Sequence, residues 1–469
     1  MKRFRNIFIF TFILSLISCE GLVDGINDNP NAIAVESADA GLLLLKGIHL
    51  ANVSVQLGHQ ARIGSMWSGQ SQGVLLLYKS IAEYNISAEE TNGMWQNAYQ
   101  GIIKQCKVLR EQTASNPAIK LYSGITKVIE AQTFGTLASL FGDVPFTEAA
   151  TDVANPKFES QKQVLNSVQT LLDEAIAELE AAPTATVADD LFYAGNKTKW
   201  IKAANTIKAR FFILTREYEK ALVSAKKGIL LKADAMVFTP PAIGNGSLNT
   251  VFKMINERAG YWGFTGSFMD NMLKPGANSR NHTKTNEAAR LRYVAFNGNT
   301  ANSNLGIAAR NRPQILVGYE ENLLYIAEAE ARVGTDAEAL KNLNTLRAHL
   351  QSGTGFEKLV ANDSLRYTAF TIQDFEAGGI ENRDNKAVKT ALLREIIQER
   401  YVTTFLTHVP FEDLRRLSGK ERDIAVLPTF NISTATKYPQ RFVVAQTELS
   451  ANPNAPSDPG IFAETEINR

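Results

Sequence analysis

Residues 200–231 read WIKAANTIKARFFILTREYEKALVSAKKGILL, and this stretch decides the fold. Trp200 and Ile207 lie two helical turns apart on one apolar face, so residues 200–215 are predicted to form a helix with Trp200 in the core. A minimal turn then leads into a second apolar pattern over residues 218–231. The stretch therefore predicts two consecutive helices that pack against each other.

The same plan recurs later in the chain, where residues 323–333 and 336–350 flank Gly334. In both pairs the second helix opens with a short charged segment followed by Ala-Leu, at Ala221-Leu222 and Ala339-Leu340. Small residues at these points let helices approach closely, as in tetratricopeptide-type (TPR) pairs. We therefore expect an all-α fold that contains TPR-type helix pairs. Further helices are predicted over residues 164–179, 387–407 (stopped by Pro410) and 411–417.

Long segments without clear periodicity separate these helices. Loops of such length inside an ordered domain are usually functional or disordered. The segments are residues 58–84, 234–284, 296–312, 351–386 and 430–469.

The N-terminus has the features of a bacterial lipoprotein signal. Residues 1–5 are basic, residues 7–16 are largely apolar, and Leu16-Ile17-Ser18-Cys19 follows. The apolar part is shorter than the roughly 20 residues of a membrane span. We expect cleavage before Cys19 and a diacylglycerol on its thiol; a plain secretory signal with an incidental cysteine is the alternative.

These features predict three parts of the chain. Residues 1–18 are the signal peptide, and residues 19–37, rich in Gly, Asn, Asp and Pro, are a lipidated tether. Residues 38–469 then form a single helical domain. Cys106 is the other cysteine, so a lipidated Cys19 leaves no intramolecular disulfide to stabilise the fold.

The charge balance excludes a nucleic-acid-binding role. The whole chain carries 49 Lys and Arg against 48 Asp and Glu. Removing residues 1–18 takes away Lys2, Arg3 and Arg5, so the net charge changes from +1 to −2. No basic field that could neutralise phosphates remains.

No motif for catalysis, a metal or a cofactor stands out. The five histidines form no metal-ligand pattern, and neither a phosphate-binding loop nor a dinucleotide fingerprint occurs. Gly69-Gln70-Ser71-Gln72-Gly73 resembles a nucleophile elbow, but no buried strand precedes it, so we interpret it as coincidental. Asp143 lies between Gly142 and Pro145, where the end of a helix explains both neighbours.

Aromatic residues in two of the irregular segments are the candidate ligand contacts: Trp67, Tyr78, Tyr261, Trp262 and Phe264. Aromatic rings on loops stack on sugars or on peptide side chains at low entropic cost. Glycines around Trp262 favour a loop that presents its ring, although the same cluster could cover a local core. Trp95, by its helical spacing, is instead predicted to lie in the core.

Together these residues resemble the SusD/RagB family of nutrient-binding outer-membrane lipoproteins, in its SusD-like branch. The likeness runs from the Cys19 region through Trp95 and the segments 141–149, 195–210 and 321–332. It continues through 395–416 to 441–452. Residues 286–292 depart from the Asp-Pro-Arg string that many members of this branch carry, so no ligand contact is transferred from the family to this chain.

The resemblance implies a TPR-containing helical SusD-like fold, a lipid anchor in the outer membrane at the cell surface, and no catalysis or cofactor. It also implies a SusC-like TonB-dependent β-barrel as partner and a glycan, or a peptide, as ligand. Two alternatives stay open: a surface hydrolase with an unrecognised site, and a helical adaptor that binds only protein.

Overall fold

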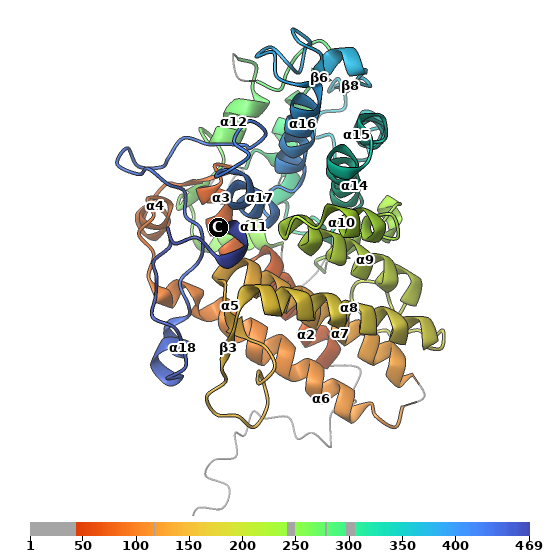
Figure 1. The fold of residues 1–469 in the computed structure, drawn as a ribbon, viewed down its shortest axis with the longest axis vertical. Helices are drawn as coiled ribbons and strands as arrows, with labels where there is room; N and C mark the ends of the chain where they lie inside the picture. The colour runs from red at the N-terminus through yellow and green to blue at the C-terminus, as the bar shows by residue number, and fades with distance from the viewer. Residues whose placement is uncertain (1–43, 117, 242–248, 277–278, 297–304) are drawn as a thin grey trace, which may run out of the picture.

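Stacked helix pairs form the larger part of the computed structural model, which describes residues 44–116, 118–241, 249–276, 279–296 and 305–469. Helix α7 packs on α8, α8 on α9, α9 on α10, α10 on α14, and α14 on α15. Figure 1 shows this stack curving from α6 and α7 at the bottom to α15 at the upper right. The prediction of an all-α fold with TPR-type pairs is confirmed.

The helix bounds follow in chain order. The α-helices are α2 (Leu44–Leu57), α3 (His59–Trp67), α4 (Leu76–Ala82), α5 (Asn92–Gln96), α6 (Lys104–Gln112), α7 (Ile119–Phe141), α8 (Gln161–Ala181), α9 (Lys197–Leu214), α10 (Tyr218–Ala225), α11 (Thr250–Glu257), α12 (Phe268–Leu273), α13 (Ala288–Val294), α14 (Tyr319–Val333), α15 (Asp336–Gln351), α16 (Val388–Thr403), α17 (Val409–Leu417) and α18 (Gln446–Ala451). Shorter 3₁₀ or π turns are η1 (Ala88–Thr91), η2 (Asn97–Ile103), η3 (Lys232–Asp234), η5 (Gly306–Ala308), η6 (Ile372–Phe375) and η7 (Glu466–Asn468).

The strands of the described residues are short and form four antiparallel two-stranded ladders. Each ladder joins segments that are separated in the sequence, so the strands tie loops together rather than build a sheet. The pairs are β1 (Gln72–Gly73) with β5 (Trp262–Gly263), β2 (Val144–Pro145) with β3 (Phe158–Glu159), β4 (Met236–Phe238) with β7 (Gln314–Val317), and β6 (Thr285–Asn286) with β8 (Arg366–Tyr367).

The predicted helix pairs agree with α9, α14 and α15 to within a few residues, but α10 ends at Ala225, well before the predicted residue 231. The chain beyond the helix passes so close to α9 that a Cβ at Gly228 would lie 2.5 Å from the Thr206 hydroxyl oxygen. Pro410 also differs from its predicted role, since it lies in the first turn of α17, a position that tolerates proline.

The prediction that residues 58–84 are irregular is wrong, because α3 and α4 lie within them. Helices α11 and α12 similarly occupy parts of the segment 234–284, and α18 part of 430–469. These helices have between six and nine residues. Two turns are too few to display a periodic pattern in the sequence, so their formation depends on packing.

The core contains Trp95 and Trp200, as predicted, and buries Cys106 as well. Helices α7 and α9 approach so closely that a Cβ at Gly135 would lie 2.1 Å from Cζ of Phe211. The glycine is therefore required for this contact between neighbouring helices.

Asp143 has the structural role that its neighbours indicated. Helix α7 ends at Phe141, and Gly142 follows with φ +86°, a conformation that favours glycine. The Asp143 carboxylate then accepts a hydrogen bond from the backbone N–H of Gln161 at 3.0 Å, at the start of α8. An acid at a helix N-terminus stabilises that helix.

A buried group of charged side chains joins α14, α16 and α17. Glu328 accepts hydrogen bonds from Arg400 at 2.6 Å and Arg416 at 2.8 Å, and Arg416 also pairs with Asp413 within α17. The cationic partners lower the pKa of Glu328 well below its usual value despite the opposing effect of burial. Among the described ion pairs, Glu412 of the same helix pairs with neither Arg415 nor Arg416. Glu412 instead accepts from the Ser139 hydroxyl at 2.6 Å.

The signal peptide, Cys19 and the tether over residues 19–37 lie outside the described residues. Within the described ranges, no helix combines the length and the hydropathy that a membrane crossing requires.

Candidate functional site

Four of the five aromatic candidates are buried. Trp67 and Trp262 are each 1% exposed, Phe264 is 0% exposed and Tyr78 is 4% exposed, so the expectation that these rings lie on the surface is wrong. Tyr261 is the exception, because its side chain is only partly buried. A role for the buried four in contacting ligand stays a prediction, and it would require their exposure.

Trp67 is buried by residues from the far end of the chain. Its ring stacks on Phe442 with the centroids 4.9 Å apart, and Phe411 packs against it at 5.5 Å. Its indole N–H donates to the carbonyl of Ile81 at 2.9 Å. The small residues around Trp67 suggested few apolar neighbours, but the two rings that pack against it are more than 300 positions away in the sequence.

Trp262 and Phe264 cover a local core, which was the alternative interpretation of this cluster. The Trp262 ring lies 4.3 Å from that of Phe296, and Phe264 packs edge-on against Phe405 at 5.6 Å. The Trp262 indole N–H donates to the hydroxyl oxygen of Ser71 at 2.8 Å.

Ser71 itself has no catalytic geometry. Besides Trp262, its hydroxyl oxygen lies 2.6 Å from that of Ser65, and Ser71 is 3% exposed. A nucleophilic serine needs a general base within hydrogen-bond reach, and neither partner is one. In the described part of the chain, no group of three or more His, Cys, Asp or Glu side chains is arranged to hold a metal ion.

Above this core the chain presents an apolar surface, which we call the paired-loop surface: Val74, Leu75, Leu76, Leu77 and Tyr261. The β1–β5 ladder holds its two loops together, and the Val74 N–H donates to the Tyr261 carbonyl at 2.8 Å. The four consecutive aliphatic side chains are 46%, 49%, 70% and 46% exposed. A contiguous exposed apolar run of this kind marks an interaction site.

The backbone of this surface is unusual at two points. Leu76 has φ +46°, a conformation that costs a residue with a side chain about 1–3 kcal/mol and that clusters at functional sites. Gly260 has φ +80°, and a Cβ there would lie 3.3 Å from Cδ1 of Leu75. The guanidinium carbon of Arg258 lies 5.8 Å from the centroid of the Tyr261 ring. The guanidinium, a hydrogen-bond donor, thus lies over the Tyr261 ring.

A cleft of about 480 Å³ opens beside helix α11, which leads directly into Arg258 and Tyr261. Its volume falls within the range of about 300–1,000 Å³ that is common for ligand sites. Many of its lining side chains are polar: Ser54, His59, Gln60, Arg62, Glu89, Glu90, Asn97, Thr250, Lys253 and Glu257.

Tyr78 contacts two of the side chains that line this cleft, His59 and Arg62. Its hydroxyl oxygen lies 3.1 Å from Nδ1 of His59 and accepts a hydrogen bond from Nε of Arg62 at 3.2 Å. The other imidazole nitrogen of His59 lies 2.8 Å from the Glu90 carboxylate, and burial lowers the pKa of His59 below its usual value. The imidazole is therefore mainly neutral at neutral pH, with its ring fixed by two partners. Sequence reasoning missed this cleft because its residues come from separate helices.

The departure at residues 286–292 lies in a second buried charged group. Arg280 donates to Glu395 at 3.0 Å and to Glu399, and Arg290 donates to Glu399 at 2.9 Å. Burial, together with the nearby Glu381 and Glu399, raises the pKa of Glu395 to about 8 in spite of Arg280. This group connects α16 to α13 and to the segment that precedes it.

Comparisons with known proteins extend these observations. Residues 59–410, about three quarters of the chain, match the profile of the SusD-like family, described as "Starch-binding associating with outer membrane". A search of curated proteins found no match.

Solved structures share the fold. A SusD/RagB family protein from Bacteroides thetaiotaomicron is 20% identical, covers 89% of this chain and 95% of its own, and superposes with a TM-score of 0.65. A chitin-binding SusD homolog from Flavobacterium johnsoniae is 13% identical, covers 91% and 98%, and also has a TM-score of 0.65. A chitin-binding protein at 19% identity covers 88% and 94%, with a TM-score of 0.63.

The likeness of the helical fold to these structures agrees with the match of the family profile over most of the chain. This chain belongs to the SusD-like family, whose members are described as starch-binding and as associating with the outer membrane.

Proposed function

We propose that this protein captures a glycan at the outer membrane and passes it, chemically unaltered, to a SusC-like TonB-dependent β-barrel transporter. The observation that carries the proposal is the family match over residues 59–410. Two of the structural neighbours are named as chitin-binding, which favours a glycan over a peptide as the ligand.

We place glycan capture at Tyr261 and in the cleft beside α11. The Tyr261 ring provides an apolar face for a sugar ring, and Arg258 beside it provides hydrogen-bond donors. The polar side chains of the cleft offer donors and acceptors to the hydroxyls of the next sugars. Stacking and hydrogen bonding of this kind require no reactive group.

The four aliphatic residues of the paired-loop surface suit the transporter better than they suit the glycan. Val74 to Leu77 are all more than 45% exposed, and their side chains carry no hydrogen-bonding atoms. Such a run is stabilised by burial against another apolar surface, at about 25 cal/mol for each Å² removed from water. A glycan held at Tyr261 would then lie next to the barrel that receives it.

The lipid on Cys19 and the tether over residues 19–37 would hold the protein to the membrane while it moves relative to the barrel. The alternative of a surface hydrolase loses its one specific candidate, because Ser71 is buried between Ser65 and Trp262. The alternative of an adaptor that binds only protein remains, and it requires that no glycan binds the cleft.

Purification from native outer membranes tests the partnership. We expect the wild-type protein to co-purify with a β-barrel transporter, and replacement of residues 74–77 by serine to abolish this association while leaving the protein in the membrane. A Cys19→Ala variant should no longer be anchored to the membrane but should keep its fold. Purification without any barrel, under conditions that preserve other outer-membrane complexes, would contradict the proposal.

A further inference from the structure

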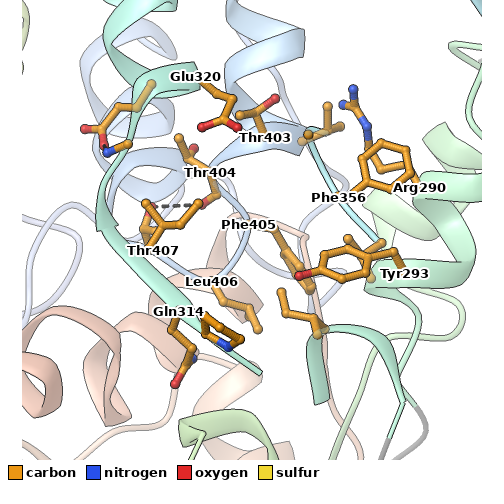
Figure 2. Close-up of a pocket in the computed structure, with 18 of the residues that line it drawn as sticks. Arg290, Tyr293, Gln314, Glu320, Phe356, Thr403, Thr404, Phe405, Leu406 and Thr407 are labelled. Carbon is orange, nitrogen blue, oxygen red and sulfur yellow. Dashed lines mark hydrogen bonds between the residues drawn. The ribbon is translucent and has the colours of Figure 1, made fainter. Parts of the chain in front are cut away.

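A separate cavity of about 150 Å³ lies between the C-terminal end of α16 and the strand β7 (Figure 2). None of its lining residues belongs to the paired-loop surface or to the cleft beside α11. Four stretches of the chain contribute to its wall, together with Leu57: residues 290–294, 307–321, 350–356 and 402–407.

Most of this wall is apolar. Figure 2 shows Phe405 and Leu406 in this wall, next to the rings of Tyr293 and Phe356, which are tilted relative to each other. The centroids of these two rings are 5.9 Å apart, and both side chains are partly buried, so they form the side of the cavity that reaches solvent. Ile307 contributes a further partly buried aliphatic side chain.

The hydroxyl groups of the threonines in the wall already donate hydrogen bonds within the protein. Thr403 donates to the Glu399 carboxylate at 2.9 Å. Thr404 and Thr407 donate to backbone carbonyls at 2.7 and 2.8 Å. Their hydroxyl oxygens therefore face any ligand as acceptors only.

Glu320 adds a further acceptor near Thr403, as Figure 2 shows. One carboxylate oxygen, Oε1, lies 2.9 Å from Nε2 of His349. Nζ of Lys232 lies 3.7 Å from Oε1 as well, and the Glu320 residue is 5% exposed. The end of the cavity around Glu320 and Thr403 thus presents acceptors. The donor side chains of the lining, Arg290 and Gln314, lie elsewhere in the wall (Figure 2).

We propose that this cavity binds a small aromatic molecule that carries one hydrogen-bond donor, of the class of phenols and indoles. An apolar cavity of about 150 Å³ is large enough for one benzene ring and favours it over water. The donor would meet the acceptors around Glu320 and Thr403. A carboxylate would be repelled by Glu320, and the Arg290 guanidinium in the wall is already paired with Glu287 and Glu399. A sugar would leave most of its hydroxyls unpaired against apolar walls.

Calorimetric titration of the mature protein with p-cresol, indole, toluene, benzoate and glucose tests this proposal. We expect p-cresol and indole to bind, toluene to bind at least several-fold more weakly, and benzoate and glucose not to bind. Glu320→Gln should narrow the difference between p-cresol and toluene. Equal binding of benzoate and p-cresol, or no binding of any aromatic, would overturn the proposal.

A pair of tryptophan substitutions locates the site. Ile307→Trp, which fills the cavity, should weaken p-cresol binding at least tenfold. Leu305→Trp, at a residue that is 63% exposed and outside the lining, should leave it unchanged. Because neither residue lies at the proposed glycan site, glycan binding should survive both changes, so this proposal and the proposed function fail separately.

Soaking crystals of the wild-type protein with 4-bromophenol tests the site without any variant, so the result does not depend on how the variants fold. Anomalous scattering should place the bromine inside the cavity, between Tyr293 and Leu406. Bromine only on the outer surface of the protein would refute the proposed site.

Discussion

Replacing Trp67 by alanine should destabilise the whole protein rather than remove a ligand contact. The ring is 1% exposed and packs against Phe442 and Phe411, so its loss leaves a large cavity in the core. Truncation of a buried tryptophan to alanine typically costs about 3–5 kcal/mol. The indole N–H also donates to the Ile81 carbonyl at 2.9 Å, and losing this bond adds about 1 kcal/mol.

The total of about 4–6 kcal/mol is a large fraction of the roughly 5–15 kcal/mol that stabilises an average domain. Urea unfolding of the mature protein, followed by circular dichroism, measures this loss as a fall in the transition midpoint. Tyr261→Ala serves as the control: its ring is only partly buried, and we expect it to cost less than about 1.5 kcal/mol. A Trp67→Ala variant with wild-type stability and no glycan binding would refute the burial of this ring.

Three further changes test the helix stack and its buried polar groups by the same unfolding measurement. Gly135→Ala should destabilise the protein by about 1–3 kcal/mol, because the added Cβ would overlap the phenyl ring of Phe211 on α9. The control, Gly93→Ala, should be neutral or stabilising, because the Cβ added at Gly93 would meet no neighbouring atom within 4 Å. Equal effects of the two changes would contradict the close approach of α7 and α9. Glu328→Gln should cost about 3–5 kcal/mol because it leaves buried arginines without their counter-charge, and a neutral effect would show that the cluster is solvated. Burial lowers the pKa of His408 from 6.5 to about 4. The stability that the neutral His408 contributes to the folded state, roughly 3 kcal/mol, is therefore present above pH 6.5 and is lost as the pH falls towards 4. His408→Asn should make the free energy of unfolding less dependent on pH in this range, and an unchanged dependence would contradict the assignment.

The helix pairs could be predicted from the sequence because their pattern is local. Residues 200–215 and 323–350 repeat apolar positions over several turns, and the structure forms α9, α14 and α15 there. Helices α3 and α4 could not be predicted in this way. They are short and are held by contacts such as the one from Trp67 to Phe442, which no local pattern encodes.

The candidate site was predicted in part. The segments that hold Trp67 and Trp262 do meet in space through the β1–β5 ladder, and they carry the exposed residues of the paired-loop surface. The individual rings were misassigned because glycine and serine neighbours indicate a flexible backbone, not an exposed side chain. Which ring reaches solvent depends on residues such as Phe296 and Phe405, whose approach no spacing reveals.

The cavity of Figure 2 and the cleft beside α11 had no signal in the sequence at all. Their walls come from several segments, and each contributing residue has an ordinary local context. Thr403 and Glu320, for example, look like a helix end and a helix start, and their common orientation depends on how α16 packs against α14.

Calorimetric titration of the mature protein, with Cys19 removed, against chitin and starch oligosaccharides and short peptides tests the central claim most directly. Tyr261→Ala is the site variant, and Tyr122→Ala on α7, another partly buried tyrosine, is its matched control. We predict saturable binding of an oligosaccharide that Tyr261→Ala weakens about tenfold and Tyr122→Ala leaves unchanged, with no binding of peptides. Binding of peptides alone, or oligosaccharide binding that is unaffected by Tyr261→Ala, would contradict glycan capture at this surface.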